Sequence, residues 1–310
     1  MRASEREAVL DLLEGAFDLR TLFARYMDHD PLFGPGDFLL ALDGTRPVSC
    51  VQIFDKRIYL FGREVHLGGI GSVATHPDFR GRGLASELLK RSEPRMRDRG
   101  MPLALLFTGI TRFYSKLGWI RAFMDLNSYR RGAAFRGPAN DLSTRRFDDA
   151  DLAEVMAIYD QDNANRPGST IRNESYWHGQ LRYAGAEGED FRVVERDGRI
   201  VAYARHLQMA ACQIMEHASM PGELDSLAAL IASMTQGRRR LLIRSPAPAL
   251  DAALIELGLE VERHRDPAPM WRVLDLPALQ DLAGIEGDDE ALIDVLVRQP
   301  GTHFWLSDRF

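Results

Sequence analysis

The sequence predicts an α+β fold, with a mixed sheet in each of two similar halves and a short C-terminal tail. First, the order helix, hairpin, strand, helix, strand, helix, strand occurs twice along the chain. Second, residues 131–140, which include Gly132, Gly137 and Pro138, lack a periodic pattern and separate the two occurrences. Third, a length of 310 residues suits two domains of about 150 residues each. We therefore predict domains at 1–130 and 141–276, a linker at 131–140 and a tail at 277–310.

The first half begins with residues 5–17, whose apolar side chains recur at helical spacing. Short apolar runs that end at turn residues then predict strands over 37–42, 48–54 and 65–75. An apolar stripe that begins at Leu84 predicts a helix, which Gly100 ends. Residues 101–107 form a buried-strand pattern, and 112–117 form a short helix that Gly118 stops.

The second half repeats this order. A helix is predicted over 148–159, and a hairpin turns at Asp197-Gly198 between the strands 191–195 and 200–207. Helices over 224–234 and 249–257 then alternate with strands over 240–243 and 269–276. In the tail, we predict a helix over 289–298 before the aromatic end HFWLSDRF.

Composition narrows the classes of function. The net charge of −6 argues against a general affinity for nucleic acid or anionic lipid. No apolar run is long enough to span a bilayer, and the N-terminus carries charges where a signal peptide needs apolar residues. Two cysteines make no disulfide framework, and His206 and His264 have no partner at metal-ligand spacing. We expect a soluble, cytoplasmic protein without a metal, and a homo-oligomer stays open.

The most informative segment runs from Thr75 to Ala85, where a strand ends, a glycine-containing loop follows and a helix begins. Such a loop presents backbone N–H groups at a helix N-terminus, where the helix dipole favours an anion. Gly81 and Gly83 let a ligand approach the backbone closely, and Arg80 and Arg82 add positive charge. A pyrophosphate is the natural ligand; the alternative is an ordinary strand-to-helix turn.

Three motifs in this region resemble the GNAT superfamily of N-acetyltransferases. Arg80, Gly83 and Ala85 complete its acyl-CoA motif, Arg/Gln-x-x-Gly-x-Gly/Ala. The segment VATHP before the loop and FYSKLGW after it are similar to two further segments of that superfamily. The resemblance covers roughly residues 35–125 and implies two tandem GNAT-type domains, with acetyl-CoA as a cosubstrate.

The resemblance implies a role for each matching residue. The backbone of Val73, Ala74 and Thr75 would pair with the pantetheine arm, and the Val73 N–H would stabilise the oxyanion. The amides from Gly81 to Ser86 would hold the pyrophosphate. Tyr114 would be the general acid that protonates the leaving thiolate; its alternative is packing. The expected acetyl-CoA residues are Val73, Ala74, Thr75, Arg80, Gly81, Arg82, Gly83, Leu84, Ala85, Ser86, Gly109 and Ile110.

The general base is less clear from sequence. Glu64 and His66 lie on or just before the strand that leads to the loop. The tandem halves and aromatic end also resemble the enhanced-intracellular-survival type of acetyltransferase, in which the terminal carboxylate is the base. That resemblance implies the role for Phe310. In that type a sterol-carrier-like domain follows the second half. The alternative here is a tail that only covers the core, because about 40 residues after Met270 are too few for such a domain.

The second half departs from the acyl-CoA motif. Its corresponding segment, SMPGEL over 219–224, has no arginine-glycine loop; Pro221 lacks an amide donor and Glu223 repels a phosphate. We expect this half to be degenerate and to complete the substrate cleft. Arg172, Tyr176 and Trp177 are expected to pack, with a place in the cleft wall as the alternative.

The predicted function is acetyl transfer from acetyl-CoA to a primary amine, by direct attack in a ternary complex. No cysteine lies near the motifs to carry an acyl-enzyme. The acidic balance favours a cationic small molecule as acceptor. Two alternatives stay open: a non-catalytic acyl-CoA-binding regulatory module, and a Fem-type aminoacyl transferase.

Overall fold

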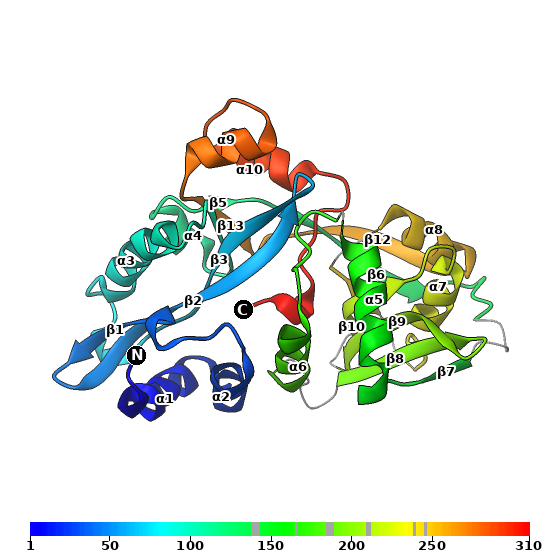
Figure 1. Cartoon of the computed structure of the whole chain (residues 1–310), viewed down its shortest axis with the longest axis horizontal. Coiled ribbons are helices and arrows are strands. Elements are labelled where there is room, and N and C mark those ends of the chain that lie inside the picture. Colours follow the sequence, from blue (N-terminus) through cyan, green and yellow to red (C-terminus); the bar gives the residue numbers. More distant parts are fainter. Residues whose placement is uncertain (138–142, 165, 184–188, 209–211, 238–239, 245–246) are drawn as a thin grey trace.

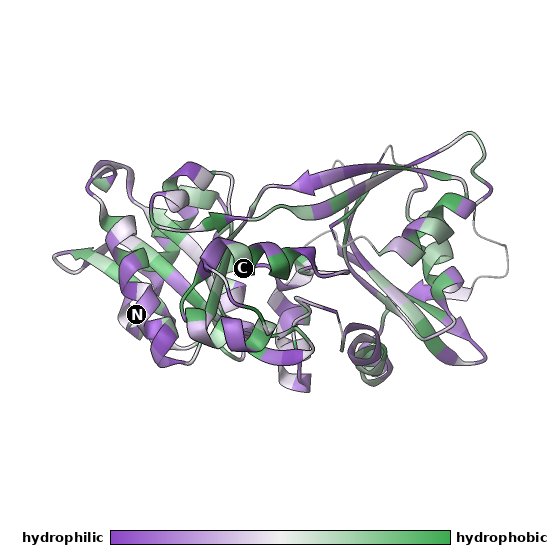
Figure 2. Cartoon of the chain, turned by 90° about the horizontal axis from the view of Figure 1, so that it is seen from above, coloured by the Kyte–Doolittle hydropathy of each residue, from purple (hydrophilic) through white to green (hydrophobic). Residues whose placement is uncertain are grey.

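The chain forms two sheets with helices around each, in a computed structural model that describes residues 1–310 except 138–142, 165, 184–188, 209–211, 238–239 and 245–246 (Figure 1). The predicted α+β class with two mixed sheets is confirmed. Figure 2 shows the same two halves from above, side by side. Part of the predicted linker lies outside the described residues.

The first sheet has six strands in the order β1-β2-β3-β4-β13-β5. Their bounds are Phe38–Asp43 (β1), Arg46–Leu60 (β2), Arg63–Thr75 (β3), Leu103–Phe107 (β4), Pro269–Val273 (β13) and Ile120–Arg121 (β5). The accompanying helices are α1 (Arg6–Phe17), α2 (Arg20–His29), α3 (Leu84–Asp98) and α4 (Thr111–Ser115). Only β3 and β4 pair in parallel; the other neighbours are antiparallel.

The second sheet has seven strands in the order β12-β6-β11-β10-β9-β8-β7. Their bounds are Leu259–Asp266 (β12), Met124–Arg131 (β6), Leu241–Ile243 (β11), Cys212–Ser219 (β10), Arg199–Gln208 (β9), Glu189–Arg196 (β8) and Ser143–Arg146 (β7). Its helices are α5 (Leu152–Asn163), α6 (Glu174–Tyr183), α7 (Leu224–Ser233) and α8 (Pro248–Glu256). As in the first sheet, an antiparallel hairpin, β9–β10, is followed by a parallel strand, β11.

Each sheet takes one strand from the other side of the predicted linker. β6 precedes the linker but pairs with β11 and β12 in the second sheet. β13 comes after the second half but inserts between β4 and β5 in the first sheet. The predicted boundaries at 1–130 and 141–276 therefore do not coincide with the two sheets. That residues 1–130 and 141–276 are separate domains stays a prediction.

The strands β3 and β4 separate at the end that leads to the predicted loop. Their pairing covers Leu67–Gly69 with Leu103–Leu105. Beyond it, the register of β2 and β3 shifts between Cys50 and Gln52, and Ser72 takes a φ of 51°. This irregularity is a β-bulge, which bends β3 away from β4. Residues 70–75 therefore do not pair with β4 on that side.

The tail packs on the first sheet and ends between the halves. Helices α9 (Leu276–Ala283) and α10 (Asp289–Arg298) place Leu279, Leu292 and Ile293 on the apolar face of the sheet that includes Leu103 and Trp271. Met96 and Leu88 of α3 cover the opposite face. Figure 1 shows the C-terminus close to β2 and α6. The tail thus completes the core and brings the end of the chain to the gap between the sheets.

Candidate active site

A cavity of about 480 Å³ lies where β3 ends and α3 begins. Nine of the expected acetyl-CoA residues line it, together with Tyr114, Phe79 and Phe113: Val73, Thr75, Arg80, Gly81, Gly83, Leu84, Ala85, Ser86 and Ile110. Three expected residues are not in its lining. Ala74 is buried against α1, Gly109 is exposed, and Arg82 lies over the Phe79 ring and donates to the Asp78 carbonyl at 2.9 Å.

The loop between β3 and α3 has the geometry of an anion site. Gly81 and Gly83 take φ values of 75° and 77°, which side chains larger than glycine adopt only with strain. The first intrahelical bond of α3 runs from the Glu87 N–H to the Gly83 carbonyl at 3.0 Å. The N–H groups of residues 84–86 precede it, so they point from the helix N-terminus without an intrahelical acceptor. Arg80 steadies the loop, since its Nε donates to the Thr75 carbonyl at 3.2 Å.

Tyr114 lies in α4, on the side of the cavity across from the loop. Its side chain packs at right angles against Phe113 and Trp119, and the residue is 6% exposed. Burial raises the pKa of Tyr114 to about 12. The hydroxyl therefore keeps its proton at neutral pH, as a general acid must before it reacts.

Phe79, Phe113 and Ile110 give the cavity an apolar wall. Ile110 is 65% exposed, a high value for a large apolar residue, and all three line the same cavity. The sequence motifs contain Phe79 and Phe113, but no role was predicted for either residue. Their apolar character beside a glycine loop was the available signal, because a pocket for a pantetheine chain needs apolar walls.

The end of the chain lies against the bulged part of β3. A side-chain carbon added to Gly69 would meet the Phe310 ring at 2.6 Å, and one added to Gly71 would meet the backbone carbon of Phe310 at 3.1 Å. The Phe310 ring stacks on Phe54 with centroids 5.2 Å apart and contacts Phe107 at 5.8 Å. Phe310 therefore occupies space that exists because residues 69 and 71 lack side chains.

The two other candidate bases, Glu64 and His66, lie far from Val73 at the cavity. Val73 is seven residues beyond His66 along β3, which corresponds to roughly 23 Å at 3.3 Å per residue. His66 bonds to the Asp55 carboxylate at 2.6 Å and the Arg99 carbonyl at 2.9 Å, and Glu64 pairs with Arg57. Glu64 and His66 thus have structural partners and are not placed to accept a proton at the cavity.

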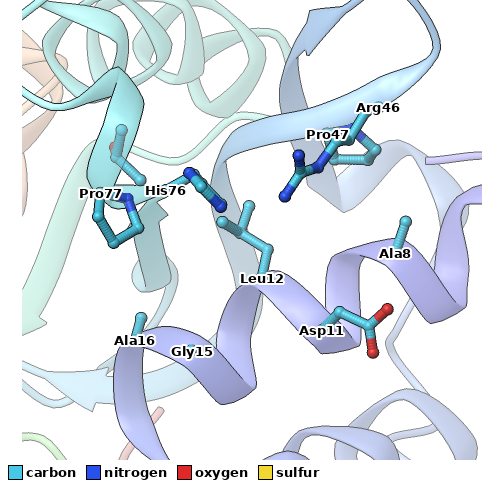
Figure 3. A pocket seen from close by; sticks show the side chains of 10 residues that line it. Ala8, Asp11, Leu12, Gly15, Ala16, Arg46, Pro47, His76 and Pro77 are labelled. Carbon is cyan, nitrogen blue, oxygen red and sulfur yellow. The ribbon is translucent and has the colours of Figure 1, made fainter.

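A second cavity, of about 350 Å³, adjoins the first and shares Thr75 with it (Figure 3). Arg46 and His76 extend toward one another across Leu12 of α1. We assign it no chemical role.

In the second half, an acidic side chain lies at the position that corresponds to the loop. Glu223 directly precedes α7, accepts from the Ser226 hydroxyl at 2.7 Å and pairs with Arg196 at 2.9 Å. A carboxylate thus lies at this helix N-terminus, where a phosphate would have to bind. This agrees with the expected degeneracy of the second half.

Arg172, Tyr176 and Trp177 are 5%, 3% and 0% exposed, so they pack inside the molecule and do not form an open cleft wall. The packing expected from the sequence is therefore correct for all three.

Two buried histidines contact the ring of Trp305 in the tail: His217 of β10 and His303 of the tail itself. His217 lies 4.8 Å from the Trp305 ring and His303 lies 4.6 Å from it, measured between ring centroids. Burial lowers the pKa of His217 to about 3 and that of His303 well below its usual value, and Arg166 lowers both further. Both imidazoles are therefore neutral in the folded protein.

These pKa values predict a loss of stability in weak acid. Between pH 6.5 and pH 3 the unfolded chain binds more protons than the folded one, so stability falls as pH falls below 6.5. For His217 the loss is about 2 kcal/mol at pH 5. Urea unfolding at pH 7 and pH 5 measures it. The His217→Phe variant, which cannot titrate, should lose less stability than the wild type over this interval; an equal loss would contradict the assignment.

Known proteins agree with this geometry. Residues 1–122 match the family model of the acetyltransferase (GNAT) domain. This match identifies residues 1–122 as a GNAT-type acetyltransferase domain, as the motifs predict.

The relatives include N-acetyltransferases named Eis. The chain is 23% identical to the N-acetyltransferase Eis of Mycobacterium tuberculosis over 277 residues, which is 85% of this chain and 69% of the relative. A GCN5-related N-acetyltransferase from Anabaena variabilis has the same fold, with a TM-score of 0.71 and 17% identity over 90% of this chain and 73% of that one. Eis1 from Mycobacterium abscessus also has a similar fold, with a TM-score of 0.60 and 16% identity over 86% of this chain and 73% of that one.

Within the described ranges, no helix combines the length and apolar character that crossing a bilayer requires. The same residues contain no group of three or more His, Cys, Asp or Glu side chains arranged to bind a metal ion.

Proposed function

We propose that this protein transfers the acetyl group of acetyl-CoA to the primary amine of a small molecule, by direct attack in a ternary complex in the cytoplasm. The observation that carries the proposal is the cavity that joins the N-terminus of α3 to Tyr114. Its two ends offer what the cosubstrate needs: donors for a diphosphate and an acid for a thiolate.

In this proposal the chain's backbone binds most of the cosubstrate. The N–H groups between Gly81 and Ser86 hold the diphosphate, and the separation of β3 from β4 supports pairing of the pantetheine with residues 73–75. The Val73 N–H then lies at the thioester carbonyl and stabilises the oxyanion of the tetrahedral intermediate. Gly109 and Ile110 lie beneath the pantetheine. Acetyl-CoA supplies the acyl group and the leaving thiolate.

Tyr114 and Phe310 move the protons in this proposal. The amine attacks the thioester carbon; as the C–S bond breaks, the Tyr114 hydroxyl protonates the thiolate. The attacking nitrogen loses its proton to the terminal carboxylate of a chain that ends at Phe310. The position of the Phe310 backbone carbon beside Gly71, two residues from Val73, supports this role.

An amine panel tests the reaction. Release of CoA from acetyl-CoA is followed with a thiol reagent in the presence of polyamines, amino acids, aminoglycosides and a lysine peptide. We expect release that depends on at least one amine and an acetylated product by mass spectrometry. Tight CoA binding with no release for any amine would instead support a regulatory acyl-CoA-binding module.

A matched pair of variants tests the diphosphate site. A side chain at Gly81 would meet no atom within 4 Å, and Asn and Asp both tolerate its positive φ. We expect Gly81→Asp to raise the Kd for CoA about tenfold or more above that of Gly81→Asn, because only the carboxylate repels a phosphate. Isothermal titration calorimetry measures both. Equal Kd values would place the diphosphate elsewhere.

A further inference from the structure

We propose that Arg172 is a positioning residue for the reaction. Through Asp308 it holds the last residues of the chain against β3. This inference rests on the proposed function, because it explains how Phe310 is kept beside the acetyl group.

Arg172 is held at the centre of the molecule and cannot contact an acceptor. Its side chain is 0% exposed, and its guanidinium lies over the rings of Tyr159 and Trp177, 4.1 and 4.4 Å from their centroids. Its Nη2 donates to Asp308 Oδ2 at 2.6 Å and to Glu216 Oε2 at 2.7 Å. A charge buried so completely needs partners of opposite charge, and the tail supplies one of the two carboxylates, so Arg172 favours the tail in place.

Asp308 receives further hydrogen bonds from the second half. The Tyr176 hydroxyl donates to its Oδ1 at 3.0 Å, and Lys56 of β2 donates to that hydroxyl at 2.7 Å. The neighbouring Ser307 donates to Glu216 at 2.6 Å, and Gln180 donates to the Ser307 carbonyl at 3.2 Å. These bonds fix the 3-10 turn Leu306–Asp308, two residues before the end of the chain.

The two residues after this turn have little freedom left. The Tyr26 hydroxyl donates to the Arg309 carbonyl at 3.0 Å, and Arg309 pairs with Asp266 at 3.0 Å. Phe310 then lies over Gly69 and Gly71. A fixed Asp308 therefore determines where the carboxyl group of Phe310 lies.

The residues of the second half that bind the tail lie near the bulge of β10. This bulge corresponds to the bulge of β3, which lies at the proposed reaction site of the first half. In both hairpins the second strand carries a bulge: β3 at Ser72, and β10 between Ile214 and Glu216. In the first half Phe310 lies at the bulge; in the second half, Glu216 beside the bulge binds Arg172 and Ser307. The second half thus binds the turn Leu306–Asp308 of the tail.

The experiment uses the 310-residue chain and three variants: Asp308→Asn, Arg172→Met and Tyr176→Phe. Carboxypeptidase A, which removes a C-terminal phenylalanine, reports how often Phe310 leaves its place. We expect release of phenylalanine to rise about tenfold or more in the first two variants, the scale of one lost charged hydrogen bond. Tyr176→Phe removes a hydroxyl and no charge, and should give an intermediate rate in a protein that stays folded.

Turnover is measured in parallel. We expect kcat to fall with phenylalanine release, while the Kd for CoA stays at the wild-type value, because no changed residue lines the cavity. Asp294→Asn and Arg298→Met are matched controls, since this ion pair in α10 is exposed. Both should behave as wild type.

Unchanged phenylalanine release in Arg172→Met and Asp308→Asn would overturn the proposal, and so would increased release with unchanged kcat. Absence of turnover in the wild type with every amine is a different failure. It would refute the proposed function, whereas the digestion rates would still show whether Arg172 anchors the tail.

Discussion

Replacing Tyr114 with phenylalanine should lower kcat by about 10²-fold or more, the usual scale for a lost general acid. The ring would remain packed against Phe113 and Trp119, so the wall of the cavity would be preserved. Only the proton donor would be lost, and the thiolate would have to leave unprotonated or take a proton from water. Steady-state kinetics with the best amine of the panel measures kcat, and calorimetry should give an unchanged Kd for CoA.

The matched control is Tyr59→Phe, a half-buried tyrosine of β2 outside the cavity lining. It should keep wild-type kinetics. A Tyr114→Phe enzyme with wild-type kcat would remove Tyr114 from the mechanism and leave it a packing residue.

The second large effect is expected from one glycine added after Phe310. The new carboxylate would lie one residue further along the chain, about 3.8 Å away by Cα spacing. That exceeds the hydrogen-bond reach of 2.6–3.2 Å that a base needs, so kcat should fall by about 10²-fold. The comparison is Phe310→Leu, which loses the stacking on Phe54 but keeps the carboxylate in sequence.

Steady-state kinetics over pH 6–9 measures kcat of the chain with the added glycine. Phe310→Leu should retain more of the wild-type kcat than the extended chain. An extended chain with wild-type kcat shows that another group or a water chain takes the proton.

The loop and Tyr114 could be predicted from the sequence because their motifs are local. Gly81 and Gly83 lie within a few residues of a strand end and a helix start, so spacing alone indicates the turn and its exposed amides. The structure places the local motif residues Arg80, Gly83, Ala85 and Tyr114 in one cavity.

The rest of the site depends on contacts between distant parts of the chain. Arg172 and Asp308 are 136 residues apart, and nothing in the sequence around either indicates the other. Gly69 and Gly71 resemble ordinary strand glycines until Phe310 is seen to lie on them. The strand pattern over 269–276 predicts β13 but not the sheet that it joins, because apolar alternation does not identify a neighbour. No strand was predicted at β6, which also joins the sheet of the other half.

The position of β13 has a consequence for how the protein is made. The edge of β4 that β13 covers stays open until residues 269–273 have left the ribosome, and β5 has no other neighbour in its sheet. Open strand edges invite aggregation during synthesis, and N-terminal units otherwise fold first. The first sheet is therefore complete only after residues 269–273 have been made, and a fragment that lacks them would carry an unprotected edge of β4.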